Sequence, residues 1–299
     1  MRRLATALAL LSVLTALACG TEEAPLPPTP VASVPRDGRV ESFDGLSIAY
    51  TVSGSADGAL VFVHGWSCDR GYWEAQVEDL SHDLPVVTID LAGHGDSGMQ
   101  RVDWSVEAFG RDVEAVVDAL DLTSVILVGH SMGGPVVLEA ARRMPGRVVG
   151  VIGVDTLQDV ELRIPEEAWD EILDGLERDF SGACQTFVRS MFQPSADPEL
   201  VGEVAGDMCT APPEVAIAVL RELPKYDVAA AVDAAGVPLR CINGTGFPTN
   251  VGTNRKHAPD FDVYLMEGVG HFPMLERPDE FNRLLRQAVE ELTASRTTG

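Results

Sequence analysis

The chain has 299 residues, of which 45% are hydrophobic and 23% are charged, and this composition is typical of a soluble globular protein. It carries 46 acidic residues against 22 lysines and arginines, so the formal net charge is −24 at pH 7. So acidic a surface repels phosphate backbones and anionic lipids, which argues against nucleic acid as a partner.

The N-terminus has the pattern of an export signal. Arg2 and Arg3 precede an apolar run over residues 4–18 that is too short to span a bilayer comfortably. The run ends in Ala-Leu-Ala followed by Cys19, which resembles a bacterial lipoprotein signal, in which the cysteine becomes the lipidated first residue. Ordinary secretion with a small-residue cleavage site nearby is the alternative. We therefore expect a signal peptide over 1–18 and a bacterial cell-envelope protein, exported and either anchored to the membrane through lipidated Cys19 or secreted.

Proline recurs from residue 25 to residue 35, within a stretch rich in threonine, alanine and glutamate. Such a composition buries too little apolar surface to fold, and proline keeps the backbone extended. We expect residues 19–39 to form a tether and the folded part to begin near Val40.

Short apolar runs alternate with helical patterns beyond this point. The runs are nearly continuous and β-branched, as strands buried on both faces of a parallel sheet are. Between and after them, apolar residues recur at helical spacing over 106–120, 135–143 and 281–292. The alternation predicts an α/β fold with a mostly parallel, twisted sheet and helices on both faces. The expected strands include residues 60–64, 86–90, 125–129, 148–154, 238–243 and 262–266.

The alternation stops over residues 156–235, where helical stripes follow one another without a strand. A solvated acidic insertion is one interpretation. Its position after strand 6 also places it over the C-terminal edge of the sheet, where α/β proteins bind ligands. We therefore expect a helical lid over 156–235 and a core made of 40–155 and 236–299.

Four cysteines remain besides Cys19, namely Cys68, Cys184, Cys209 and Cys241. Disulfides persist outside the cytoplasm, so Cys184 with Cys209 is the pair that we expect, although four cysteines allow three pairings. No Cys/His spacing suits a metal site, and we expect no metal.

The strongest chemical signal is the run Gly-His-Ser-Met-Gly at residues 129–133, directly after a predicted strand and before a predicted helix. In that setting Gly-x-Ser-x-Gly is a nucleophile elbow, a turn so tight that its flanking positions must be small. The turn exposes the Ser131 hydroxyl above the sheet edge, and the helix behind it points N–H groups at developing negative charge. An ordinary strand-to-helix turn is the weaker alternative.

With three further motifs, the chain resembles the serine α/β-hydrolase family over residues 40–292. His-Gly-Trp at 64–66 looks like the family's oxyanion loop, and residues 90–97 are similar to its D-x-x-G-x-G-x-S segment. Residues 268–278 resemble the late loop that carries its catalytic histidine. The resemblance implies the α/β-hydrolase fold, with a helical cap inserted after strand 6, and a serine hydrolase. We expect no cofactor.

The chemistry of acyl transfer indicates the role that each candidate residue would have. A serine hydroxyl needs an adjacent imidazole to take its proton, and His271 is the candidate base. The resemblance places the two oxyanion donors on the backbone N–H groups of Trp66 and Met132. Of the other five histidines, those at 64, 94 and 130 sit in turn motifs and are expected to be structural, and those at 82 and 257 are expected at the surface.

The carboxylate that would orient His271 is the least direct of these assignments. Many family members carry an aspartate after the seventh strand, but here residues 241–250 contain no carboxylate. Other members carry the acid at the end of the sixth strand, where this chain has Asp155. We expect Asp155 to orient the histidine, with Asp159 as second choice, and we assign Asp260 and Asp262 to the entry of the next strand.

These assignments predict an esterase that cleaves a small carboxylic ester through an acyl-enzyme on Ser131. A lactonase, thioesterase, carbon–carbon hydrolase or perhydrolase would use the same three residues, and fold does not fix substrate. Two other classes of protein are alternatives. One is a ligand-binding or signalling protein on this scaffold, favoured only by the missing carboxylate after strand 7. The other is a structural envelope lipoprotein, which leaves four ordered motifs unexplained.

Overall fold

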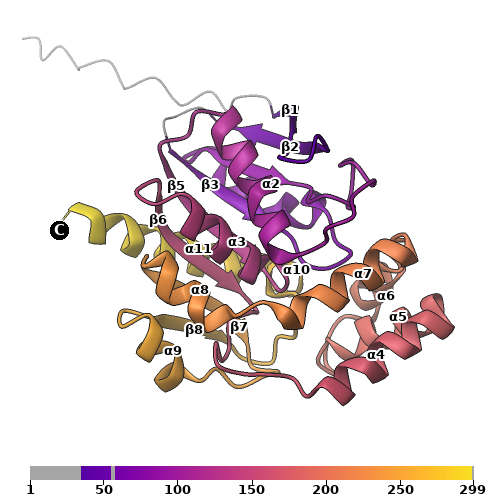
Figure 1. The fold of residues 1–299 in the computed structure, drawn as a ribbon. Coiled ribbons are helices and arrows are strands. Elements are labelled where there is room, and N and C mark those ends of the chain that lie inside the picture. The colour runs from indigo at the N-terminus through magenta and orange to yellow at the C-terminus, as the bar shows by residue number, and fades with distance from the viewer. Residues whose placement is uncertain (1–34, 55–57, 298–299) are drawn as a thin grey trace, which may run out of the picture. The chain divides into compact units, whose positions relative to one another are not determined.

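One mixed sheet organises the fold in the computed structural model, which describes residues 35–54 and 58–297 (Figure 1). The strand order is β1-β2-β4-β3-β5-β6-β7-β8, with β1 and β2 antiparallel to their neighbours and the other pairs parallel. The predicted fold class is confirmed. The strands are β1 (Arg36–Glu41), β2 (Ser47–Ser53), β3 (Gly58–Val63), β4 (Val86–Ile89), β5 (Ser124–His130), β6 (Val148–Val154), β7 (Leu239–Gly244) and β8 (Asp262–Met266).

The predicted strands correspond to β3 through β8. The central four are almost entirely buried, because helices cover both of their faces. The hairpin of β1 and β2 was not predicted, and β1 begins at Arg36, inside the predicted tether of 19–39. The predicted signal peptide and Cys19 lie outside the described residues.

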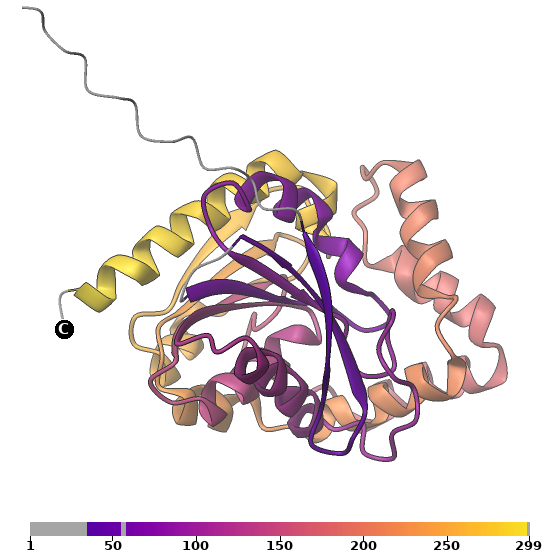
Figure 2. The same cartoon turned by 90° about the horizontal axis from the view of Figure 1, so that it is seen from above.

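Helices cover the sheet in two groups. Helices α2, α3 and α8 pack side by side on one face, while α1 and α11 lie on the other (Figure 2). Ser105 begins α2 by accepting a hydrogen bond from the backbone N–H of Ala108, the usual role of serine at an N-cap. The core helices are α1 (Glu74–Leu80), α2 (Val106–Ala119), α3 (Gly133–Arg143), α8 (Val228–Ala235), α9 (Val251–His257), α10 (Pro273–Glu276) and α11 (Pro278–Thr297).

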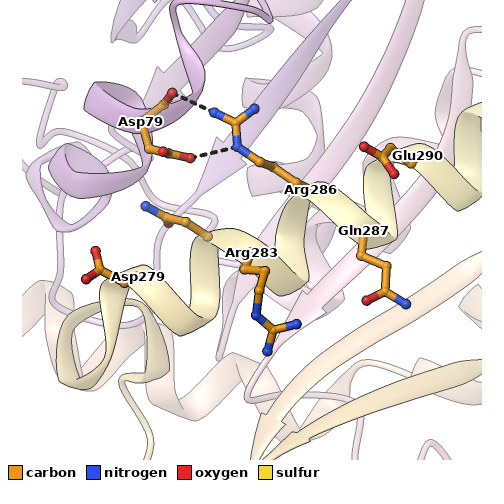
Figure 3. Close-up of a pocket in the computed structure, with 7 residues that line it drawn as sticks. Asp79, Asp279, Arg283, Arg286, Gln287 and Glu290 are labelled. Atoms are coloured by element: carbon orange, nitrogen blue, oxygen red, sulfur yellow. Dashed lines mark hydrogen bonds and ion pairs between the residues drawn. The ribbon is translucent and has the colours of Figure 1, made fainter.

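The closing helix α11 is tied to α1 by charge. Arg286 donates from Nε to Asp79 Oδ2 at 2.9 Å (Figure 3), and it also pairs with Asp83 at 3.2 Å. Asp79 and Arg286 border an open, charged hollow formed by α1 and α11, which contains none of the predicted catalytic residues. The contact is partly exposed, so it contributes little to stability by itself.

Most of the segment between β6 and β7 forms a cap of four helices, α4 (Glu166–Arg178), α5 (Phe180–Ser190), α6 (Pro198–Met208) and α7 (Pro213–Glu222). The predicted lid extended to residue 235, but α8 packs against α3 on the sheet and therefore belongs with the core. Where the chain leaves the cap and returns to the sheet, the Tyr226 hydroxyl donates a hydrogen bond to buried Glu139 on α3 at 2.9 Å. Within the described part of the chain, no helix is both long and apolar enough to cross a membrane.

A disulfide joins Cys184 of α5 to Cys209, which follows α6, and closes a loop of 25 residues inside the cap. Cys68 and Cys241 are buried free thiols. Closing a loop of that length restricts the unfolded chain and is worth about 3.5 kcal/mol.

We expect the double variant Cys184→Ala/Cys209→Ala to lose about that much free energy of unfolding in a urea titration. Dithiothreitol should lower the stability of the natural chain in the same direction and leave the double variant unchanged. Equal urea midpoints for both proteins under oxidising conditions would contradict a stabilising disulfide.

Candidate active site

Ser131 stands on the tight turn between β5 and α3. Its φ is +52°, in the left-handed region that a non-glycine residue rarely adopts. The turn needs the flanking glycines, because a Cβ on Gly129 would lie 2.3 Å from the carbonyl oxygen of Gly133, and one on Gly133 would lie 2.5 Å from that of Val63. The elbow therefore holds the Ser131 hydroxyl at the C-terminal edge of the sheet.

A line of hydrogen bonds joins the three predicted catalytic side chains. His271 Nε2 lies 2.8 Å from Ser131 Oγ, and His271 Nδ1 lies 2.5 Å from Asp155 Oδ2. Asp155 is buried, with 4% of its side chain exposed, whereas the His271 ring is 20% exposed. The structure thus brings together a hydroxyl, an imidazole and a buried carboxylate that come from three separate loops.

Asp155 follows β6 directly and has a strained φ of +42°. Its Oδ1 accepts a hydrogen bond at 2.9 Å from the backbone N–H of Gly244, at the end of the adjacent strand β7. The loop after β7, which has no carboxylate of its own, thus supplies a hydrogen-bond donor to the Asp155 carboxylate at the end of β6. The second-choice acid, Asp159, instead accepts from Asn250 at 2.8 Å, and Asp262 is exposed in β8.

The loop of His271 is held from three sides. Glu276 accepts hydrogen bonds from the backbone N–H groups of Gly270 and Phe272, on either side of the histidine, at 3.0 and 3.2 Å. The N–H of His271 donates to the carbonyl of Met191 in the cap at 3.0 Å. On the third side, His130 Nε2 donates to the carbonyl of His271 at 2.8 Å. The position of the imidazole thus depends on both core and cap.

The predicted oxyanion donors lie beside the elbow. Trp66 and Met132 line the same cavity as Ser131. The approach of the two loops is close, since a Cβ on Gly65 would lie 2.8 Å from His130 Nδ1 and 3.2 Å from Ser131 Cβ. In the described part of the chain, neither the Trp66 N–H nor the Met132 N–H donates to another protein group. Both backbone donors therefore remain available to a ligand.

Two buried histidines hold the loop of Trp66 in place. His64 donates from Nδ1 to the carbonyl of Gly65 at 2.8 Å and accepts from the N–H of Leu91 at Nε2. His94 donates to the carbonyl of Ala92 and accepts from the N–H of Ser67 at 3.3 Å. Burial lowers the pKa of His64 to about 4 and that of His94 to about 3, and it holds the pKa of His130 well below its usual value. Each imidazole is therefore neutral at pH 7.

These pKa values predict a loss of stability in mild acid. Above pH 6.5 both the folded and the unfolded chain carry neutral imidazoles at 64 and 94. Between pH 6.5 and about 4, the unfolded chain binds protons that the folded chain excludes, so the free energy of unfolding falls as the pH falls. At pH 5 the loss is about 2 kcal/mol for each histidine.

Urea unfolding at pH 7.5 and pH 5.0 measures this loss. His94→Asn should reduce the difference between the two pH values, because the unfolded variant has one imidazole fewer to protonate. A natural chain equally stable at both pH values would contradict the argument.

The cavity above Ser131 has a volume of about 560 Å³ and lies between the sheet edge and the cap. Its cap wall comes from all four cap helices and is mostly aromatic or aliphatic. The cap residues of this wall include Ile164, Trp169, Ile172, Phe187, Met191, Phe192, Met208, Leu220 and Leu223. No group of three or more His, Cys, Asp or Glu side chains in the described residues is arranged to hold a metal ion.

The remaining histidines and the supporting groups differ in how far they could be predicted. His82 is exposed, as expected, while His257 is half-buried between Asp233 and Glu161, at 3.0 and 3.1 Å. The support from Glu276 and Met191 was missed. Glu276 follows the histidine by five residues, and this spacing could have indicated its supporting role. Nothing in the local sequence points to Met191.

Comparison with known proteins identifies the class. Residues 60–284 match the Alpha/beta hydrolase family, and the chain belongs to that family. The non-heme chloroperoxidase of Streptomyces lividans is 35% identical over 144 residues, which cover 45% of this chain and 52% of the relative, so the match spans about half of that protein's length.

Two further similarities cover more of the molecule. The Karrikin insensitive 2 receptor CA of Petunia hybrida is 23% identical over 243 residues, covering 76% of this chain and 90% of the relative. The structure of the esterase RhEst1 from Rhodococcus sp. ECU1013 aligns with a TM-score of 0.71 and 26% identity, covering 86% of this chain and 99% of that one. The proteins similar to this chain thus include one named as an esterase and one named as a receptor.

Proposed function

We propose that this protein is a serine hydrolase that cleaves a carboxylic ester through an acyl-enzyme on Ser131. The observation that carries the proposal is the unbroken line from Ser131 Oγ through His271 to Asp155, at 2.8 and 2.5 Å. That line connects a nucleophile, a base and an orienting carboxylate in the order that acyl transfer requires. The similarity to an esterase over 86% of this chain supports the same reaction.

In the proposed reaction, Ser131 Oγ attacks the ester carbonyl while His271 Nε2 takes the hydroxyl proton. The tetrahedral oxyanion accepts hydrogen bonds from the N–H groups of Trp66 and Met132, and each such donor is worth about 2.7–4 kcal/mol. The C–O bond then breaks, and His271 returns the proton to the leaving alcohol. Water, activated by the same imidazole, attacks the acyl-serine and releases the acid. Asp155 stabilises the imidazolium throughout.

Rapid mixing with 4-nitrophenyl hexanoate tests this mechanism. The expected result is turnover together with an acyl adduct on the peptide that contains Ser131, detected by mass spectrometry after an acid quench. A fluorophosphonate should label the same residue. Turnover without any adduct at Ser131, in quenched samples or with the fluorophosphonate, would contradict the acyl-enzyme.

A receptor with little turnover is the second candidate, and the similarity to the Petunia receptor favours it. The two functions differ in their products. A receptor would bind an apolar ligand saturably and release less than one equivalent of 4-nitrophenol, whereas a hydrolase releases many equivalents.

A further inference from the structure

The cavity above Ser131 is lined by a particular chemistry. Apart from the backbone and the predicted catalytic groups, the polar side chains among its described lining residues are Ser190 and Gln193 of the cap, and buried Cys68 and His130. Lysine and arginine are absent from those lining residues. The Asp155 carboxylate already lies in the wall of the cavity. A carboxylate on the substrate would therefore add a second negative charge with no cationic side chain to pair with it.

One wall of the cavity joins the predicted oxyanion loop to the cap. The Trp66 indole donates from Nε1 to the carbonyl of Ala216 in α7 at 2.9 Å. The same ring meets the edge of Phe187 in α5, with ring centroids 5.8 Å apart and planes at 70°. Both rings line the cavity, so a group bound beside Ser131 lies against an aromatic corner held by two cap helices.

The apolar character continues to the mouth. Ile164 at the start of the cap and Phe247 in the loop after β7 both line the cavity, yet they are 48% and 69% exposed. Large exposed apolar side chains at a cavity mouth are suited to contact an apolar molecule as it enters. The cavity of about 560 Å³ also lies within the range of sites that enclose drug-sized molecules, well above the needs of an acetyl group.

We propose that the acyl group transferred to Ser131 is uncharged and apolar, either a chain of six or more carbons or an aromatic group, and that Phe187 determines this preference. The inference rests on the proposed ester hydrolysis and specifies its substrate class. Each methylene moved from water into an apolar site is worth about fourfold in binding. Four additional methylenes therefore permit a gain of more than tenfold in kcat/KM for hexanoyl over acetyl esters.

A matched set of 4-nitrophenyl esters tests the substrate class on the natural chain at pH 8. The acetate and the hexanoate differ in length, and the hexanoate and the monoester of adipic acid share a six-carbon acyl group but differ by one carboxylate. We expect kcat/KM for the hexanoate to exceed that for the acetate at least tenfold and that for the adipate at least a hundredfold.

Two phenylalanines of α5 provide the variant and its control. Phe187→Ala should lower the ratio of kcat/KM for the hexanoate to that for the acetate about tenfold, because the acyl chain of the hexanoate loses its contact with the aromatic ring. Phe180→Ala removes a ring from the same helix outside the cavity and should leave the ratio unchanged. If Phe187→Ala does not fold, Phe187→Leu should lower the ratio by a smaller factor.

The outcomes separate this inference from the function on which it rests. Ser131-dependent hydrolysis that is equal for acetate and hexanoate, or for hexanoate and adipate, would overturn the substrate class and leave ester hydrolysis standing. An unchanged ratio in folded Phe187→Ala would overturn the role of that residue. No Ser131-dependent hydrolysis of any ester, with no acyl adduct, would overturn both proposals.

Discussion

Ser131→Ala is expected to lower kcat for 4-nitrophenyl hexanoate by about 10⁶-fold, the loss seen when the nucleophile of a serine protease is removed. The variant has no oxygen to form the acyl-enzyme, so only the oxyanion donors and the binding of the substrate remain. Ester hydrolysis followed at 400 nm measures the effect. The elbow should still fold, because alanine fits wherever serine does.

Ser181→Ala is the matched control, since Ser181 is an exposed serine of α5 that does not line the cavity. It should retain full activity, and all three proteins should melt at similar temperatures. If Ser131→Ala kept more than a hundredth of the natural activity, another group would have to be the nucleophile.

Asp155→Asn is expected to lower kcat by about 10⁴-fold with little change in stability. In the proposed mechanism, the carboxylate accepts a hydrogen bond from the Nδ1–H of His271, so Nε2 carries no proton and can take the one from Ser131. An asparagine amide that donates to Nδ1 instead would force the proton onto Nε2, which then cannot act as a base. The loss should diminish as the pH rises, because hydroxide ion replaces the missing base.

Asp159→Asn separates this role from a general effect of charge. Asp159 lies four residues further along the same loop, but its carboxylate contacts Asn250 and the N–H of Glu161 rather than the histidine. It should keep near-normal activity. The reverse ranking of these two variants would assign the acid to Asp159.

Local motifs made much of the fold and site predictable. The elbow depends on residues 129–133 alone, and the buried strands depend on continuous β-branched runs. Asp155 came from the family resemblance, because residues 241–250 carry no acid and some family members carry it at the end of strand 6, where this chain has Asp155. The hairpin of β1 and β2 escaped prediction because β1 is mostly exposed and lacks a long apolar run.

Long-range packing made the rest unpredictable. Residues 228–235 follow the cap helices without an intervening strand, so they were predicted as part of the lid, and nothing in that short run shows that α8 packs against α3. Trp66 and Phe187 meet across 121 residues of sequence, and Met191 meets His271 across 80. These pairs arise from how the cap sits on the core, which no short pattern encodes.

The bond from the His271 N–H to the Met191 carbonyl has an evolutionary consequence. Both of its groups belong to the backbone, so replacing the side chain at position 191 need not disturb the imidazole. That side chain faces the cavity, as do many of its neighbours in the cap. Selection can therefore change what the cavity accepts, one side chain at a time, while the backbone of the same segment keeps the His271 imidazole in place. A chain built this way can change the molecules that it binds without displacing that imidazole.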